Sequence, residues 1–128
     1  MSHDILWRND AGYEHARRGA VSNGRKPNRF PDVIVRAQSN GDVVAAVQLA
    51  KERGLKIGIR SGGHSWAASF LRDGGMLLDL AQMNSFSVDV STRTATIQPA
   101  LKGSDLNRAL LKDRLPHTWW SWGPRLTA

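Results

Sequence analysis

The sequence predicts an α+β fold in which a strand–helix–strand unit is followed by further strands, a hairpin and a last helix. The first observation is the order of an apolar run, a helical repeat and a second apolar run over residues 33–35, 40–53 and 56–59. This order is typical of a right-handed βαβ unit. The second observation is the alternation of apolar and polar residues on both sides of a turn at residues 91–93, which predicts a β-hairpin.

The first thirty residues are polar and rich in glycine and asparagine. We therefore expect an irregular lead-in over residues 1–30, with a short helix near residues 14–18. Trp7, Tyr13 and Arg17 stand out in this region, and we interpret each of them as packing against the body of the domain. The first residues lack a charged head followed by an apolar run, so no secretory signal is visible and the default expectation is a cytoplasmic protein.

The clearest elements follow Pro31. Val33 to Val35 form an apolar run of the length expected for a buried strand. Ser39 can cap the helix predicted over residues 40–53, and Gly54 supplies its C-terminal stop. We expect the apolar face of this helix to cover a sheet, and the residues assigned to that face are Val43, Val44, Val47 and Ala50.

Residues 76–80 predict a third strand, and the hairpin follows over residues 86–98. Ser104 is expected to cap a last helix on which Leu106, Ala109 and Leu110 share one face. Three acidic residues in this half are interpreted as loop and strand-end residues rather than general bases, because aspartate so often serves turns. They are Asp73, Asp79 and Asp89, of which Asp79 either caps the following turn or is simply solvated.

The segment from Arg60 to Ser65 directly follows the second predicted strand and contains two adjacent glycines. Glycines without a Cβ can adopt φ > 0 and expose successive backbone N–H groups, which suits a phosphate or pyrophosphate. Taken alone, such a short motif is more often a plain turn. Additional charge and hydrogen-bond donors would come from Arg60, Ser61 and Ser65.

His64 is the reactive side chain of this segment. An imidazole can act as a nucleophile near neutral pH, bind a metal or carry protons. The simpler interpretation is an exposed or hydrogen-bonded loop residue. The four histidines of the chain show no paired metal spacing, so we predict no metal site.

In its context the segment resembles the flavin-binding domain of the vanillyl-alcohol oxidase superfamily, and within it the berberine-bridge-enzyme-like FAD-linked oxidases. The matching residues are Arg60 to Ser65, the helix end at residues 49–55 and the strand at residues 77–80. The likeness extends from about Trp7 to Leu115. It implies the N-terminal lobe of a PCMH-type FAD-binding domain.

The resemblance also implies the cofactor and the function. FAD is the expected cofactor, and His64 is the residue that becomes covalently joined to the flavin ring. Some members add a second attachment through a cysteine, which this cysteine-free chain cannot form. The implied activity is that of an oxidase that passes a hydride from a small-molecule substrate to the flavin and on to oxygen. The residues implied to bind FAD are Arg60, Ser61, Gly62, Gly63, His64 and Ser65.

The bulk properties leave one alternative open. A net charge of +7 favours anionic partners, but the cations are scattered and no aromatic residues interleave with them. We therefore expect neither a nucleic acid nor a membrane as partner. The alternative function is a non-catalytic anion- or nucleotide-binding module that uses the same glycine loop.

The domain organisation expected from these patterns has three parts. Residues 1–30 are the lead-in and residues 31–115 the first lobe of an FAD-binding domain. Residues 116–128 form a divergent tail with three tryptophans, at positions 119, 120 and 122. We favour a truncated or frameshifted reading frame over a functional aromatic patch for this tail, and we expect the fragment to be inactive as an enzyme on its own. No catalytic residue is assigned.

Overall fold

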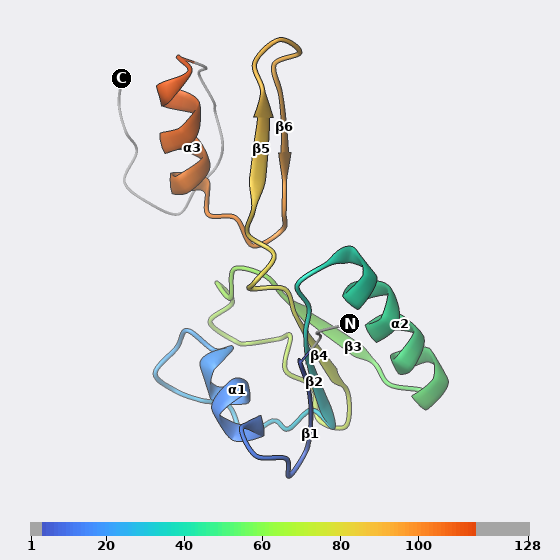
Figure 1. The fold of residues 1–128 in the computed structure, drawn as a ribbon. Coiled ribbons are helices and arrows are strands. Elements are labelled where there is room, and N and C mark those ends of the chain that lie inside the picture. The colour runs from blue at the N-terminus through green and yellow to red at the C-terminus, as the bar shows by residue number, and fades with distance from the viewer. Residues whose placement is uncertain (1–3, 115–128) are drawn as a thin grey trace.

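The computed structural model describes residues 4–114, which form a four-stranded sheet with a helix on each face, followed by a hairpin and a third helix (Figure 1). This is the predicted α+β fold. The elements are β1 (Asp4–Trp7), α1 (Tyr13–Gly19), β2 (Val33–Arg36), α2 (Asn40–Arg53), β3 (Ile57–Arg60), β4 (Met76–Asp79), β5 (Phe86–Asp89), β6 (Thr94–Ile97) and α3 (Gly103–Lys112).

The strands of the sheet follow the order β1-β2-β4-β3. β2, β4 and β3 are parallel, and β1 pairs antiparallel with β2 at one edge. The predicted strand–helix–strand unit is therefore present as β2, α2 and β3, but β4 lies between its two strands and pairs with both.

The two central strands are buried on both faces. In β2, Val33 and Val35 belong to the apolar cluster under α2, whereas Ile34 belongs to the cluster under α1. Burial of parallel strands on both faces explains why their sequences are continuous apolar runs rather than alternating ones. The corresponding residues of β4 are Met76 and Leu78 toward α2 and Leu77 toward α1.

The predicted caps of α2 are confirmed. The Ser39 side chain accepts a hydrogen bond of 3.2 Å from the Asp42 amide, and the Asp42 carboxylate in turn accepts one from the Ser39 amide. Gly54 ends the helix in the left-handed conformation, with φ of 64°. This reciprocal cap satisfies donors that the first helical turn cannot pair internally.

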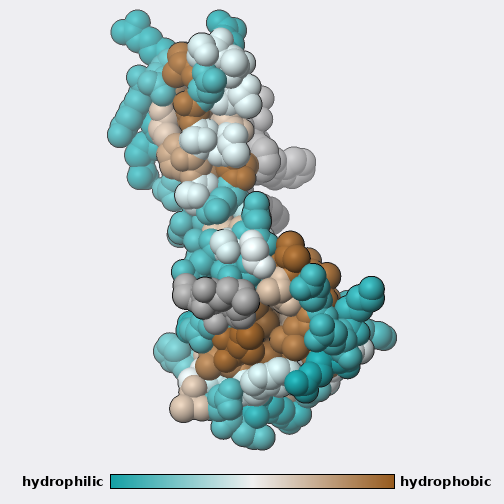
Figure 2. Space-filling view, turned by 45° about the vertical axis from the view of Figure 1, so that its right-hand side comes forward, coloured by the Kyte–Doolittle hydropathy of each residue, from teal (hydrophilic) through white to brown (hydrophobic). Residues whose placement is uncertain are grey.

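The predicted apolar face of α2 was partly wrong. Ala46 and Ala50 are buried against the sheet, but Val44 and Val47 are 57% and 47% exposed. Each residue advances about 100° around a helix, so only one stripe can face the sheet. Apolar side chains also reach the surface elsewhere, as the space-filling view shows (Figure 2), and Trp66 is 82% exposed.

The N-terminal region is more regular than expected. α1 confirms the short helix predicted near residues 14–18, whereas β1 is a strand that the predicted irregular lead-in over residues 1–30 did not include. The packing interpretation of Tyr13 is confirmed, because its buried hydroxyl donates a 2.5 Å hydrogen bond to the Pro31 carbonyl. Trp7 is half-buried, with the Arg53 guanidinium 4.9 Å from its ring centre.

The hairpin β5-β6 forms as predicted and lies beyond the end of β4, beside α3 (Figure 1). The expectation for Ser104 was wrong: the N-cap of α3 is Lys102, without a side-chain hydrogen bond, and Ser104 lies within the first turn. Leu106 and Leu110 are buried on α3 as expected.

The tail predicted at residues 116–128 lies outside the described residues. Within residues 4–114 no helix is long and apolar enough to cross a membrane.

Substitution of Gly58 by alanine should destabilise the fold. A Cβ at this position of β3 would lie 1.9 Å from the Phe70 carbonyl oxygen, a backbone atom that cannot move without shifting the segment packed on the sheet. We expect the free energy of unfolding to fall by about 1–3 kcal/mol or more, as for overpacked cores. Urea unfolding followed by circular dichroism measures this loss.

Gly24→Ala is the matched control, because no atom lies within 4 Å of a Cβ built at Gly24. Its stability should remain within about 0.5 kcal/mol of the parent chain. Equal unfolding midpoints for the two variants would show that Phe70 is not fixed against β3.

Candidate functional site

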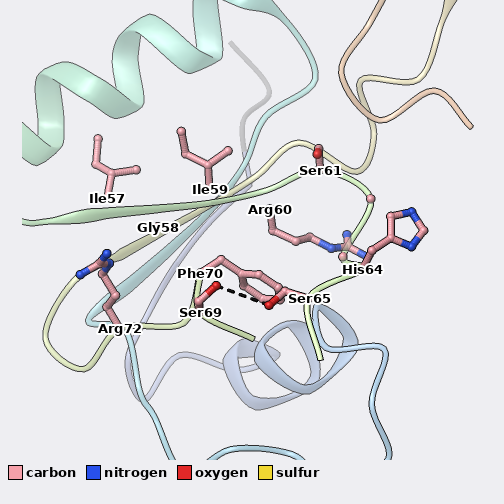
Figure 3. Close-up of a pocket in the computed structure, with 12 residues that line it drawn as sticks. Ile57, Gly58, Ile59, Arg60, Ser61, His64, Ser65, Ser69, Phe70 and Arg72 are labelled. Carbon is pink, nitrogen blue, oxygen red and sulfur yellow. Dashed lines mark hydrogen bonds between the residues drawn. The ribbon is translucent and has the colours of Figure 1, made fainter. Parts of the chain in front are cut away.

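A groove of about 520 Å³ follows β3 and the loop after it (Figure 3). It is lined by residues 57–65 together with Ser69, Phe70 and Arg72. All six predicted site residues, Arg60 to Ser65, therefore line one groove. It lies at the carboxyl end of a parallel strand, where open α/β sheets generally bind ligands.

The two glycines of the loop have different roles. Gly63 adopts a φ of +70°, and a Cβ there would lie 3.0 Å from the Arg60 Nε and 3.4 Å from the Ala20 carbonyl oxygen. Gly62 has no positive φ, so only one of the two uses the left-handed conformation expected of both. A Cβ on Gly62 would instead lie 2.6 Å from the imidazole Cδ2 of His64.

The loop presents unpaired backbone donors. The amides of Gly62, Gly63, His64 and Ser65 donate to no acceptor within residues 4–114. Successive free N–H groups around a left-handed glycine form a concave site for an anion. This arrangement suits a phosphate, so phosphate binding through the loop backbone stays a prediction.

His64 is exposed, and its imidazole stands outside the loop backbone (Figure 3). The ring makes no hydrogen bond to another described residue. Ser65 and Ser69 lie close to the same groove, with their hydroxyl oxygens 3.4 Å apart. The imidazole is thus accessible to a molecule that occupies the groove.

Arg60 forms an ion pair inside the protein. Its Nη1 lies 2.9 Å from the Asp79 Oδ1, and the two side chains are only 16% and 11% exposed. Asp79 also accepts a 3.0 Å hydrogen bond from the Ala81 amide, so it caps the turn after β4, one of the two roles considered from the sequence. Arg60 Nε is buried without a partner among the described residues. The pairing with Asp79 was not predicted.

The Arg60–Asp79 pair is part of a row of alternating charges across the sheet. Strand register aligns Asp4 with Arg36, Arg36 with Asp79, and Asp79 with Arg60. Arg36 and Asp4 also form an ion pair. The four residues come from four separate segments, so no local pattern could have revealed the row.

A family model described as an FAD binding domain matches residues 31–124 of the chain. Among curated proteins, the FAD-linked oxidoreductase nodO of Hypoxylon pulicicidum is 40% identical over 113 residues, which cover 86% of this chain and 25% of the relative. The (R)-6-hydroxynicotine oxidase of Paenarthrobacter nicotinovorans is 35% identical, covering 85% of this chain and 23% of the relative. The chain thus spans about a quarter of the length of these relatives.

Solved structures agree with these matches. The crystal structure of 6-hydroxy-D-nicotine oxidase from Arthrobacter nicotinovorans superposes with a TM-score of 0.75 and 32% identity, over 88% of this chain and 24% of that structure. BBE-like 1 from Physcomitrella patens gives a TM-score of 0.73 and 27% identity, over 88% of this chain and 24% of that structure. The fold is therefore that of the flavin-binding region expected from the sequence.

Neutralising Asp79 should destabilise the chain through the loss of its pairing with Arg60. Asp79→Asn keeps the shape of the side chain and an oxygen for the Ala81 amide, but removes the charge. Hydrogen bonds to charged groups contribute about 1.5–3 kcal/mol. We expect a loss in that range for Asp79→Asn, measured by urea unfolding, and a smaller additional loss when Arg60→Gln is combined with it.

The exposed pair Arg108–Asp105 is the control, with its atoms 3.8 Å apart and its side chains 74% and 48% exposed. A double-mutant cycle on such a surface pair should give a coupling of about 0–1 kcal/mol. A coupling for Arg60 and Asp79 no larger than that of the control pair would contradict the prediction.

Proposed function

Because the chain belongs to the FAD binding domain family, we propose that Arg60 to Ser65 form the site that binds the pyrophosphate of FAD. The observation that carries this assignment is the set of four amides around the left-handed Gly63 that have no acceptor among residues 4–114. A pyrophosphate is a compact polyanion, and hydrogen bonds from N–H groups to charged oxygens are among the strong ones.

The residues present fit this group. A Cβ on Gly63 would lie 3.0 Å from the Arg60 Nε and 3.4 Å from the Ala20 carbonyl oxygen, so the glycine allows the loop to pack closely against both residues. Arg60, whose Nε is buried without a partner among the described residues, lies beside the same glycine and lines the groove. The family match gives no support to the alternative of a non-catalytic anion-binding module.

His64 is the proposed point of covalent attachment. Its imidazole is exposed and lines the same groove as the loop backbone that is proposed to bind FAD. The chain has no cysteine that could provide a thiol attachment instead. A bound flavin would supply the redox chemistry, the transfer of a hydride equivalent from a substrate to oxygen, while the protein would position it.

The complete reaction is proposed for a protein that also contains the remaining length of the relatives. One relative is named for oxidation of 6-hydroxynicotine, which supports a small organic molecule as the class of substrate. No substrate contact and no catalytic role is assigned to residues 4–114. Neither nucleic acid nor a membrane is a proposed partner.

FAD binding can be tested by titrating the purified chain with FAD and following flavin fluorescence and absorbance. Gly63→Val should weaken the affinity at least about tenfold, the equivalent of roughly 1.4 kcal/mol, because valine resists φ > 0 and would contact Arg60. Gly62→Val should weaken it less, because the exposed His64 ring can move aside.

Gly24→Val is the control for this series, since Gly24 lies outside the groove and has open space around it. Circular dichroism should show the same helical content in all variants. An unchanged FAD affinity in Gly63→Val would exclude the loop from the site.

Covalent attachment should depend on His64. After incubation with FAD and precipitation with acid, we expect yellow, fluorescent protein on a denaturing gel for the parent chain. His64→Ala should lose this signal, whereas His15→Ala, a change at an exposed position of α1, should retain it. Flavin that stays bound to His64→Ala after denaturation would disprove the assignment.

A further inference from the structure

The loop at residues 60–65 and the turn that follows it are hydrogen-bonded to a segment that lies much earlier in the sequence. Residues 22–29, called the strap below, donate side-chain hydrogen bonds to backbone carbonyls of residues 63–71. The bonds run from Ser22 Oγ to the Gly63 oxygen at 2.8 Å, from Asn23 Nδ2 to the Trp66 oxygen at 3.5 Å, and from Arg29 to the oxygens of Ala67 and of Leu71, the last at 3.2 Å.

The bond from Ser22 fixes the direction of one peptide group. The described residues contain no cis peptide bond, and in a trans peptide the C=O and N–H groups point in opposite directions. Because Ser22 holds the Gly63 oxygen, the His64 amide of the same peptide points away from the strap. That amide is one of the four without an acceptor among the described residues.

Arg29 stabilises the turn at residues 65–71, which follows the loop. Its two terminal nitrogens bind the carbonyls of Ala67 and Leu71, on either side of Ala68. Ala68 is fully buried and has a φ of 46°, a conformation that non-glycine residues adopt at a cost in energy. A single planar guanidinium is therefore bonded on both sides of the strained residue.

The strap is itself fixed by α1. Arg17 is 3% exposed and donates to the carbonyls of Pro27, at 2.7 Å, and of Arg29, at 3.3 Å. The same guanidinium bonds the Glu14 carboxylate at 2.6 Å and lies 4.4 Å from the centre of the Phe30 ring. The hydrogen bond from Arg17 lowers the pKa of Glu14 below its usual value. The buried Arg17 side chain of α1 therefore holds the strap backbone at Arg29.

We propose that the strap is a positioning element for FAD binding, in which the bond from Ser22 to the Gly63 carbonyl directs the His64 amide toward the pyrophosphate and the bonds from Arg29 fix the turn that follows the loop. This inference rests on the proposed function of the loop. Neither side chain lines the groove, so both act through the loop backbone.

The test is a titration of the purified chain with FAD. Ser22→Ala should weaken FAD binding roughly three- to tenfold, the effect of one neutral hydrogen bond, with an unchanged melting temperature. Ser22→Thr keeps the hydroxyl and should restore the affinity. Ser87→Ala, at an exposed position of β5, is the control and should bind like the parent chain.

Arg29→Lys separates geometry from charge, because lysine keeps the charge but cannot bind two carbonyls in a fork. FAD affinity should fall in Arg29→Lys but not in Arg25→Lys, whose arginine lies on the same strap and is exposed. Without FAD, hydrogen exchange at the amides of Ala68 and Leu71, which are bonded within the turn, should speed up in Arg29→Lys. Exchange in β2 and β4 should not change.

Parent-like FAD affinity in Ser22→Ala and Arg29→Lys would overturn the role of the strap and leave the proposed function standing. A parent chain that binds no FAD would instead overturn the proposed function, and the role of the strap with it. If Arg29→Lys unfolds, Ser22→Ala decides the question, because Ser22 is exposed and its loss removes a single part-buried hydrogen bond.

Discussion

β3 and β4 are parallel neighbours, and the chain between them has to cross one face of the sheet to begin β4 at the correct end. Parallel strands usually meet this requirement with a helix, which pairs its own backbone groups. Here residues 61–75 make the crossover without helix or strand. Their backbone groups must therefore be paired by other parts of the molecule or left for a ligand.

The backbone carbonyls of this crossover have hydrogen-bond partners from other segments, whereas several of its amides have no acceptor among the described residues. Carbonyls of residues 63–71 are bonded by the strap, which α1 fixes through Arg17. The amides of residues 62–65 have no acceptor among the described residues. The carbonyls of the crossover thus contribute to the fold, while its first amides are donors suited to an anion. Gly58 completes the arrangement, because the crossover backbone at Phe70 lies where a Cβ would be.

Charge is organised at the same edge of the sheet. The row of Asp4, Arg36, Asp79 and Arg60 alternates in sign across the four strands, so neighbouring strands attract one another at this level. Arg60 ends the row and begins the loop, which makes its ion pair with Asp79 a link between the sheet and the proposed FAD site. An anion at the loop would lie beside a cation that the protein has already fixed in place.

The sequence by itself determined β2, α2, β3, β4, the hairpin and the glycine loop. Each depends on residues close together in the chain: a buried apolar run, a Ser39 cap with a Gly54 stop, an alternating pattern, or two adjacent glycines. The resemblance carried by Arg60 to Ser65 pointed to the cofactor for the same reason, because that motif is continuous.

Only the tertiary structure decided which residues these elements meet. It placed β1 on β2, turned Val44 and Val47 of α2 away from the sheet, and brought Ser22 to Gly63, 41 residues away. Asp79 likewise became the partner of Arg60 across 19 residues. These contacts form between segments whose own patterns do not specify their neighbours, since a serine or an arginine in a polar stretch is equally suited to solvent. The partner is selected by the path of the chain between β3 and β4, which exists only once the sheet has formed.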